Sequence, residues 1–439
     1  MSNKKLLHRT FNALIEEIRP DNLIAQQCRY ENDVFSVHGR DYPLQTYKNI
    51  HLLGSGKAVV PMAKALQSIM GDRIAQTLIV GAYENDIELD NTRYIKSTHP
   101  LPSQQSIDAA KALRKQLEIL QEDDFFIYLL SGGNSAMVEL PEASISLEDF
   151  QKTTALMLKG GMPIEEINSV RKHLSQVKGG KLAECTQAKG LVLVLSDVLD
   201  DDLHAIGSAP LYFDTTTFND AIVSLEKHAL FDHLPEGVQT FLKEGAEAKH
   251  PETPKSENTN IHHIILGSNT IVLNKAKALM DKAGIPATLS KKPLEGDATE
   301  LARELVTFAR NYQGERHCFI FGGEATVTVR GEGSGGRNQH LALSVLLLLD
   351  GECDVTFLSA ATDGVDGNSD AAGALVDMHS RVYALAHEID PQHYLETYDS
   401  NTFFSKTGEL LITGPTHNNL LDIVMMLIEP TPQKGENNG

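Results

Sequence analysis

A lysine follows directly on a glycine-rich turn early in the chain, in the segment Gly54-Ser55-Gly56-Lys57. The apolar run at 50–53 has the length of a strand, and helical periodicity begins after Ala58. Backbone N–H groups and the helix dipole attract an anion at such a turn, and the ammonium adds a full positive charge. A Walker A loop and a dinucleotide fingerprint are excluded, because His51 and Val59 stand where those motifs need small residues. The segment predicts a phosphate or carboxylate site, with a tight connection as the simpler alternative.

A second turn of the same kind carries hydroxyl and amide side chains in place of the lysine. It follows the apolar run at 125–130 and consists of Ser131, Gly132, Gly133, Asn134 and Ser135. These groups suit the carboxylate or the hydroxyls of a small polar ligand. A capped helix start, with glycine chosen for its backbone freedom, explains the same residues, and the pattern leaves both interpretations open.

Basic residues gather between Glu166 and Glu184, although the chain as a whole carries a formal charge of −20. The helical spacing of the apolar residues in this segment places Arg171 and Lys178 on a neighbouring face. A solvated basic face is the usual explanation of such a run. The two glycines that end it at 179–180 favour a function instead, so Arg171 and Lys178 are candidates for binding something negative.

An aspartate ends another strand-length apolar run, at Asp197 after residues 191–195. Mg²⁺ prefers one or two carboxylates together with phosphate oxygens and water, and a carboxylate at a strand end can also accept a hydroxyl proton. Asp197 is therefore a candidate for catalysis and for metal binding. The three aspartates at 200–202 are better explained as a solvated loop.

The densest cluster of glycines lies between Phe321 and His340, where an apolar helix begins. A nest of backbone N–H groups with an arginine at a helix start suits a triphosphate, because the planar guanidinium can bridge two phosphate oxygens. The arginine is Arg337. The residues around it that we expect to contact a nucleotide are Gly323, Glu324, Gly335, Gly336 and Asn338.

Aspartate recurs beside glycine after a further strand, from Thr362 through Asp363 to Asp366. A metal ion, a ribose and a substrate hydroxyl are all compatible with these side chains, and Asx turns explain them without a ligand. A calcium loop is excluded, because the twelve-residue pattern with a terminal glutamate is absent.

Strand-length apolar runs that end in these turns alternate with helical periodicity along the chain, which is the pattern of parallel α/β units. At 439 residues the chain exceeds the size of one hydrophobic core, so two domains are expected. The polar stretch 249–260 is the best linker. We predict an α/β domain at 1–250 and a second at 260–430, with a frayed tail at 431–439. A mixed sheet is expected in the second domain, because 325–330 could pair with the preceding strand as a hairpin.

The composition limits the partners and the compartment. A net charge of −20 argues against nucleic acid and against anionic membranes, both of which need a basic surface. No apolar run is long enough to span a bilayer, and no secretory leader is recognisable. The four cysteines have neither metal-site nor disulfide spacing. We expect a cytoplasmic protein that acts on small molecules, either as a monomer or as a homodimer.

In this order, the motifs resemble those of the glycerate 2-kinases of the MOFRL type, some of which have carried the name hydroxypyruvate reductase. The segments that carry the resemblance are GSGKA (54–58), SGGNSA (131–136), NSVRKHLSQVKGGKLA (168–183), LSDVLDDD (195–202), GGEATVTVRGEGSGGRNQ (322–339), TDGVDGNSDAAGA (362–374) and TGPT (413–416). The resemblance implies a Rossmann-like N-terminal domain, a mixed α/β C-terminal domain and an active site between them. It also implies ATP with Mg²⁺, glycerate as the acceptor, and Lys57 and Arg337 as catalytic residues.

The basic residues on an acidic chain predict roles for the other turns. We expect the carboxylate of the substrate near the 131–135 turn, paired by Arg171 or Lys178, with Mg²⁺ held through Asp197 or nearby carboxylates. Asn134 stands where the family usually has a third glycine, which bears on the acid that fits. The further residues expected at the nucleotide are Gly54, Ser55, Gly56, Thr362, Asp363 and Asp366.

Three other functions stay open at this point. An NAD(P)-dependent hydroxypyruvate reductase is disfavoured, because no strand is followed by a G-x-G-x-x-G turn. A kinase of a related small hydroxy acid fits the same residues. A metabolite sensor without catalysis is disfavoured, because Lys57 and Arg337 are both present. Phosphorylation at the 2-hydroxyl follows from the resemblance alone.

Overall fold

The computed structural model describes residues 1–82, 87, 89–351 and 353–430, so the predicted tail at 431–439 lies outside the described residues. By its internal contacts the chain divides into two compact units. We call Pro20–Leu266 the parallel-sheet unit, and Met1–Arg19 together with the residues from Gly267 onward the mixed-sheet unit.

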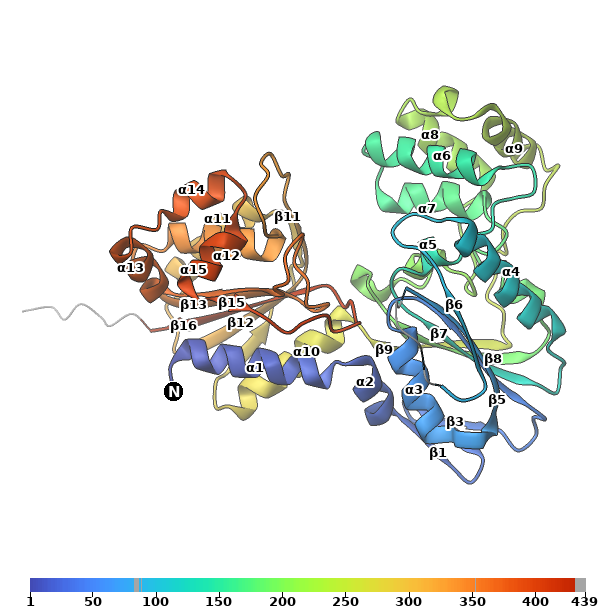
Figure 1. Ribbon diagram of the computed structural model, residues 1–439, viewed down its shortest axis with the longest axis horizontal. Coiled ribbons are helices and arrows are strands. Elements are labelled where there is room, and N and C mark those ends of the chain that lie inside the picture. The colour runs from blue at the N-terminus through green and yellow to red at the C-terminus, as the bar shows by residue number, and fades with distance from the viewer. Residues whose placement is uncertain (83–86, 88, 352, 431–439) are drawn as a thin grey trace, which may run out of the picture. The chain divides into compact units, whose positions relative to one another are not determined.

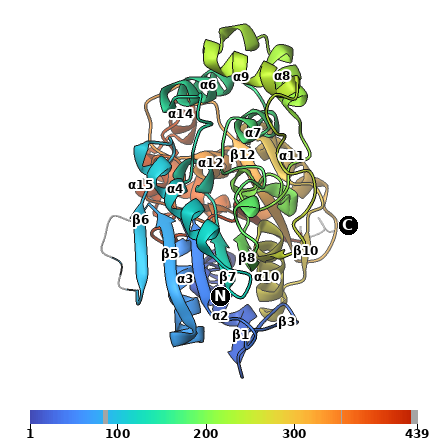
Figure 2. The ribbon, with the colours of Figure 1, turned by 90° about the vertical axis from the view of Figure 1, so that its right-hand side faces the viewer.

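A six-stranded sheet forms the centre of the parallel-sheet unit (Figures 1 and 2). In chain order its strands are β4 (Ile50–Ser55), β5 (Ile74–Gly81), β6 (Thr92–Lys96), β7 (Phe125–Leu130), β8 (Lys189–Leu195) and β9 (Ile261–Gly267). Across the sheet the order is β6-β5-β4-β7-β8-β9, and the pairings from β6 to β8 are parallel. This is the 3-2-1-4-5-6 order of the Rossmann fold, and the predicted Rossmann-like sheet is confirmed.

The strands of this sheet are apolar along their length because helices cover them. All six residues of β7 are buried, as is typical of parallel strands. Helix α4 (Gln104–Ile119) shares a core cluster with Phe126 and Tyr128, and helix α3 (Val59–Met70) packs against β4, β5 and β7. The covering helices hold the strand ends, and with them the turns, in fixed positions.

Further helices of this unit form a second core that Figures 1 and 2 both show gathered beyond one end of the sheet. They are α6 (Leu147–Lys159), α7 (Ile164–His173), α8 (Phe218–Lys227) and α9 (Glu236–Ala246). Their apolar faces meet around Phe150, Val170 and Phe218. A small antiparallel sheet of β1 (Cys28–Glu31), β2 (Val34–Val37) and β3 (Arg40–Pro43) completes the unit.

The mixed-sheet unit contains a seven-stranded sheet with helices on both faces (Figure 1). Its strands are β10 (Ala287–Leu289), β11 (Leu294–Asp297), β12 (His317–Thr326), β13 (Asp354–Ala361), β14 (Gly373–Val376), β15 (Leu410–Leu411) and β16 (Asp422–Glu429). Strands β10 and β11 run parallel to β12, whereas β12, β16, β13, β14 and β15 pair antiparallel. One face carries α11 (Ala298–Asn311), α12 (Arg337–Leu348), α13 (Met378–Ala386), α14 (Pro391–Glu396) and α15 (Ser400–Thr407), and the other α1 (Asn3–Glu17) and α10 (Asn269–Lys282). The predicted mixed α/β domain is confirmed.

The mixed sheet does not arise from the hairpin that we predicted. Strand β12 ends at Thr326, and the residues 327–336 after it form no strand. The antiparallel partners of β12 and β13 are instead supplied by β16, which comes from the end of the described chain and lies between them. The alternating β-branched residues at 325–330 therefore did not identify a strand pair.

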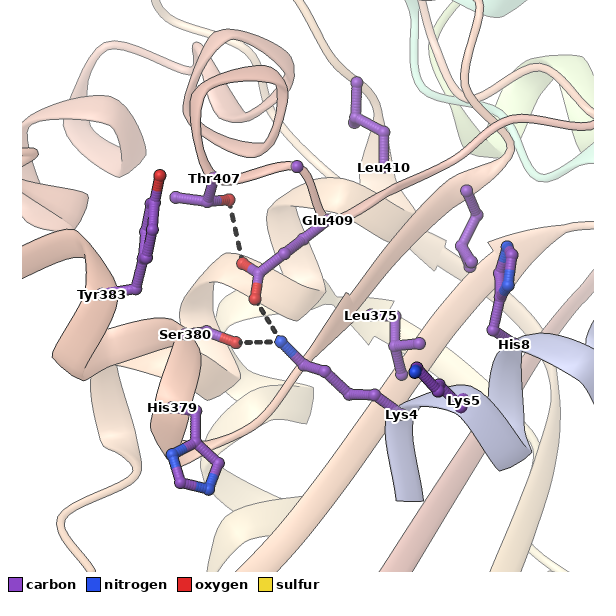
Figure 3. Close-up of a pocket in the computed structure, with 12 residues that line it drawn as sticks. Lys4, Lys5, His8, Leu375, His379, Ser380, Tyr383, Thr407, Glu409 and Leu410 are labelled. Carbon is purple, nitrogen blue, oxygen red and sulfur yellow. Dashed lines mark hydrogen bonds and ion pairs between the residues drawn. The ribbon is translucent and has the colours of Figure 1, made fainter. Parts of the chain in front are cut away.

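The first helix belongs to the second unit. The residues of α1 that are buried recur at helical spacing, among them Leu7, Phe11 and Leu14. At its first turn the Lys4 ammonium donates to the Ser380 hydroxyl and pairs with the Glu409 carboxylate, beside a pocket of about 510 Å³ (Figure 3). Helix α1 is thus fixed both by apolar packing and by an ion pair.

The unit boundaries therefore differ from the predicted ranges 1–250 and 260–430. The first nineteen residues pack with the C-terminal part of the chain, and the strand at 261–267 adds the sixth strand to the first sheet. The stretch 249–260 is not a linker between the units but a connection within one of them. It is fixed there, since Thr253 is buried and the Glu252 carboxylate lies 3.0 Å from the His173 ring.

No helix among the described residues is both long and apolar enough to cross a membrane.

Candidate functional site

The glycine-rich turns at Gly54 and Ser131 lie side by side, at the point where the strand order reverses. Strands β4 and β7 are neighbours in the sheet, with Ser55 paired to Leu130 at their carboxyl ends. In the chain β4 is followed by β5 on one side, whereas β7 starts the run to β8 on the other. Ligands of doubly wound sheets bind in the crevice that opens at such a switch point. The structure thus brings together the first two turns predicted as a ligand site.

The two turns are joined by backbone contacts that only glycine permits. Gly56 has a φ of +127°, and a Cβ there would lie 2.3 Å from the Ser131 Oγ. This hydroxyl accepts a hydrogen bond from the Ala58 N–H (3.0 Å), and the Lys57 N–H donates to the Gly132 carbonyl (2.9 Å). The start of α3, with Lys57 before it, is therefore held directly against the second turn.

A cation and a carboxylate meet at the glycine pair of the second turn. A Cβ on Gly132 would lie 2.4 Å from the Asp197 Oδ2, and one on Gly133 would lie 3.2 Å from the Lys57 Cγ. Lys57 and Asp197 are both partly exposed. Three strand ends, those of β4, β7 and β8, thus place Lys57, Asp197 and the glycine N–H groups at one spot. We call this set the glycine-pair site.

A fourth strand end adds a histidine that the sequence motifs did not single out. His99 follows β6, and its Cδ2 would lie 3.2 Å from a Cβ on Gly133. The residue is exposed, and incomplete solvation together with the Lys57 ammonium lowers the pKa of its ring. In the sequence, His99 could be found only from its position just after the segment 92–96. That segment has the length of a strand but lacks the apolar character of the other strands.

Ser55 and Asn134, which were predicted to contact ligands, point into the interior instead. Both side chains are buried, and the Ser55 hydroxyl bonds the Asn134 Oδ1 and the Tyr128 hydroxyl. The Asn134 amide donates to the Gly207 carbonyl at 2.9 Å. The hydrogen bond between their side chains therefore links the two turns inside the unit.

Of the other polar residues of the turn, Ser131 is buried and Ser135 is partly exposed. The Ser135 hydroxyl lies 2.7 Å from that of Ser208, which in turn donates to the Asn168 Oδ1 (3.1 Å). These hydroxyls are suited to the carboxylate of a small acid. Ser208 was not among the predicted residues.

Lys178 is not available to a ligand. It is fully buried, its ammonium lies 3.1 Å from the Glu139 carboxylate, and it donates to the carbonyls of Ser135 (2.8 Å) and Val138 (3.0 Å). Burial lowers its pKa to about 8. The negative partner that the basic segment predicted is thus a glutamate of the protein, and Lys178 holds α5 (Asn134–Met137) from behind.

Arg171 takes part in the same arrangement but stays partly exposed. Its guanidinium donates to the Ser135 carbonyl at 3.0 Å, and burial lowers its pKa. Lys172, its neighbour, is buried against Asp214 at 3.0 Å. Of the two residues predicted from this segment, Arg171 and Lys178, it is therefore Arg171 whose side chain reaches both the turn and solvent.

The mixed-sheet unit has a pocket of about 480 Å³ at the start of α12, formed by the predicted nucleotide loop. Arg337 stands at its edge and is held by two carboxylates. Its Nε and Nη2 donate to Asp422 (2.6 and 3.0 Å), and its Nη1 lies 2.6 Å from the Glu324 Oε1. Burial raises the pKa of Asp422 to about 6. Lining residues include Glu324, Gly335, Gly336, Arg337, His340 and Tyr398.

Several predicted nucleotide residues support this pocket without lining it. Asp366 is buried and accepts from the N–H groups of Asn338 (3.0 Å) and Gln339 (2.8 Å), so it caps α12. Asn338 is buried too and accepts from Ser359. Thr362 is buried and donates to the Leu421 carbonyl.

Gly323 and Asp363 have different surroundings from these buried residues. A Cβ on Gly323 would lie 2.6 Å from the backbone of Leu294, so a close approach of strands requires the glycine. Asp363 is partly exposed and accepts from the Val365 N–H at 3.0 Å, as in an Asx turn.

A magnesium ion has one predicted protein ligand in this arrangement. The described residues hold no group of three or more side chains that could bind a metal by themselves. Mg²⁺ usually takes only one or two carboxylates from the protein, and its other ligands are phosphate oxygens and water. Asp197 at the glycine-pair site fits the role of such a carboxylate.

Comparison with known proteins gives matches over nearly the whole chain. A family model described as a domain of unknown function (DUF4147) matches residues 6–243, and the MOFRL family model matches residues 317–422. A glycerate 2-kinase of Pyrococcus horikoshii is 35% identical, with 94% of each chain covered, and a D-glycerate 2-kinase of Thermotoga maritima is 37% identical, with 97% of this chain and 99% of that protein covered. The solved structure of a glycerate kinase from Thermotoga maritima superposes with a TM-score of 0.85 at 36% identity, covering 97% of this chain and 99% of that one. The resemblance found in the motifs is thereby confirmed, and the chain belongs to the MOFRL-type glycerate kinase family.

Proposed function

We propose that this protein is a glycerate 2-kinase, which transfers the γ-phosphoryl group of ATP to the 2-hydroxyl of D-glycerate. The observation that carries the proposal is the glycine-pair site, where Lys57 and Asp197 meet at a Rossmann switch point. A cation, a carboxylate and backbone N–H groups are the equipment of phosphoryl transfer, which depends on positioning and charge neutralisation more than on covalent chemistry. The names of the relatives supply glycerate and the 2-position.

The parallel-sheet unit binds the acceptor in this proposal. The carboxylate of glycerate takes hydrogen bonds from the N–H groups of the Gly132-Gly133 turn, the Ser135 hydroxyl and Arg171. Lys57 neutralises the phosphoryl group as it is transferred. Asp197 holds Mg²⁺, which supplies positive charge to the phosphate oxygens when it is bound.

The mixed-sheet unit binds the nucleotide at the pocket at the start of α12. Its glycine-rich walls and the Arg337 guanidinium suit a polyphosphate. Asp422 is buried and bidentate, so it keeps Arg337 oriented, whereas Glu324 is the exposed partner that phosphate oxygens replace. The stacked rings of His340 and Tyr398 line the same pocket and offer an apolar surface to a base.

The alternative reaction, NAD(P)-dependent reduction of hydroxypyruvate, has less support. The sheet has the order of a dinucleotide-binding fold, but the turn after β4 has Val59 where the fingerprint needs its third small residue. Loss of NADH absorbance in the presence of hydroxypyruvate, without ATP, would favour the reductase over the kinase.

The test of the proposed function is coupled ADP release with ATP, Mg²⁺ and each enantiomer of glycerate. We expect release that depends on D-glycerate and stops when a chelator removes Mg²⁺. ADP release with another small hydroxy acid but not with glycerate would show that the acceptor is a related acid. Absence of acceptor-dependent release with any of them would contradict it.

The expected compartment is the cytoplasm. In the described part of the chain the four cysteines are free thiols, which supports a reducing environment. The expected oligomeric state is a monomer or a homodimer, and light scattering distinguishes the two.

A further inference from the structure

His99 is held at the edge of the glycine-pair site by its own loop. The loop runs from β6 to α4, and the Ser97 N–H donates to the end of β5 at 2.8 Å. The Ser97 hydroxyl donates to the Met137 carbonyl (2.7 Å), which ties the loop to α5. The Thr98 hydroxyl donates to the Leu101 carbonyl (2.9 Å) and closes a turn around His99. The imidazole is therefore presented by a braced turn at the same sheet edge as Lys57.

The ring meets the lysine stem over the second glycine of the pair. The position of a Cβ on Gly133 would be 3.2 Å from both the His99 Cδ2 and the Lys57 Cγ. Asp197 stands on the other side, next to Gly132. Lys57 and Asp197 are the charged side chains among the nearest neighbours of this glycine pair in the described residues. A base, a cation and a carboxylate thus surround the place where the substrate is proposed to bind.

The imidazole is in the state that accepts a proton. Incomplete solvation and the Lys57 ammonium lower the pKa of the exposed His99, so the ring is neutral at physiological pH. A neutral imidazole has one unprotonated nitrogen. A phosphoryl group bound at Lys57 offsets the lysine charge and raises the pKa of His99 again, because a nearby negative charge favours the protonated ring. A phosphoryl group bound at Lys57 therefore makes His99 a stronger base.

We propose that His99 accepts the proton of the substrate hydroxyl during phosphoryl transfer, an inference that rests on the proposed kinase function. As the hydroxyl oxygen bonds to the γ-phosphorus of ATP, the bond from that phosphorus to the β,γ-bridging oxygen breaks, and ADP leaves with the electron pair. The O–H bond of the hydroxyl breaks, and its proton passes to the ring nitrogen and then to solvent. A weak base is sufficient for this step, since in protein kinases an aspartate accepts the proton of the substrate hydroxyl.

The test replaces His99 in the full chain and measures steady-state kinetics with D-glycerate and Mg-ATP. In His99→Ala and His99→Asn we expect turnover to fall by about 100-fold or more, with the KM for ATP little changed. Added imidazole should restore part of the turnover of His99→Ala but not of His99→Asn, whose side chain fills the space. His233→Ala, at an exposed histidine of the same unit, is the control and should keep wild-type turnover. Circular dichroism shows whether each variant is folded.

The outcomes separate this proposal from the proposed function. A wild-type protein without glycerate-dependent ADP release would contradict both. An active wild type together with near wild-type turnover in folded His99→Ala would overturn the role of His99 alone. A raised KM for glycerate with unchanged turnover and no rescue by imidazole would also overturn it, because His99 would then be a binding contact.

Discussion

At the scale of single residues, the glycine-pair site depends on the absence of side chains at positions 132 and 133. The carboxylate of Asp197 and the stem of Lys57 approach the backbone so closely that a Cβ at either glycine would overlap them or crowd them. The backbone of the turn therefore lies between two opposite charges. A ligand with both a carboxylate and a hydroxyl can contact both the backbone of the turn and the charged side chains beside it.

Gly132→Ala tests this arrangement. The new Cβ would stand 2.4 Å from the Asp197 Oδ2, so the carboxylate must move, and we expect turnover to fall by about tenfold or more. The matched control is Gly237→Ala in α9, where the nearest atom would be 3.8 Å away and turnover should be unchanged. Steady-state kinetics and thermal unfolding of both variants provide the comparison. Equal turnover in the two would contradict the account of the glycine pair.

The sequence allowed Lys57, Asp197 and the glycines to be proposed as site residues because each follows a strand-length apolar run. It did not separate residues that face a ligand from residues that face the interior. Asn134 and Lys178 were predicted as ligand contacts, yet both are buried against partners from distant segments, Gly207 and Glu139. His99 and Asp422 were missed because no glycine-rich turn marks them.

At the scale of elements, the short helix α5 is fixed from behind by charges of the segment after α7. The carbonyls of Ser135 and Val138 accept hydrogen bonds from Lys178, whose ammonium pairs with the buried Glu139. A cation near the carboxyl end of a helix is favourable, and here it also fixes where the turn before the helix lies. The pair is therefore a positioning device for the 131–135 turn.

Lys178→Met should destabilise the protein by about 3–5 kcal/mol, because it leaves the Glu139 carboxylate buried without its partner. The control is Lys181→Met, three residues on, where the pair with Glu142 is partly exposed and the loss should be about 1 kcal/mol or less. Urea unfolding followed by circular dichroism measures both. If the two substitutions cost the same, Lys178 does not hold the turn in the way described.

The sequence predicted most elements but not their pairing. Glycine, serine and aspartate at strand ends gave the turns after β4, β7, β8 and β13, because a strand that stops at a sheet edge needs a tight turn. The same reasoning failed at Gly322 and Gly323, which lie inside β12. The partner of β12 could not be found locally, since β16 lies about a hundred residues later in the chain. A short β-branched run such as 325–330 resembles a strand whether or not another strand is there to pair with it.

At the scale of the whole molecule, the chain crosses from one unit to the other twice. Helix α1 packs in the mixed-sheet unit, and the chain then builds the parallel-sheet unit before it returns. An amphipathic helix could be predicted at this end of the sequence from its spacing alone. The spacing of the apolar residues shows that one face of the helix is buried. The spacing does not specify which sheet covers that face.

Phe11→Ala tests the placement of α1. Phe11 is fully buried, so its removal should cost about 3–5 kcal/mol, and the loss should be confined to the mixed-sheet unit. Hydrogen exchange followed by mass spectrometry should show faster exchange in residues 267–430 and unchanged exchange in residues 20–266. Phe308→Ala, which removes a 42% exposed phenylalanine of the same unit, is the control and should have a much smaller effect. Loss of protection in residues 20–266 instead would contradict the assignment of α1.

We propose that Lys57 at the switch point serves phosphoryl transfer to the 2-hydroxyl of glycerate. The direct measurement is phosphorus NMR of the product formed from ATP, Mg²⁺ and D-glycerate by the wild type, by Lys57→Met and by the control Lys64→Met, which changes an exposed lysine of α3. We predict that the wild type and Lys64→Met form the 2-phosphate ester, while folded Lys57→Met forms it slower by orders of magnitude. Near wild-type turnover in Lys57→Met, or a product phosphorylated at the 3-hydroxyl, would contradict the claim.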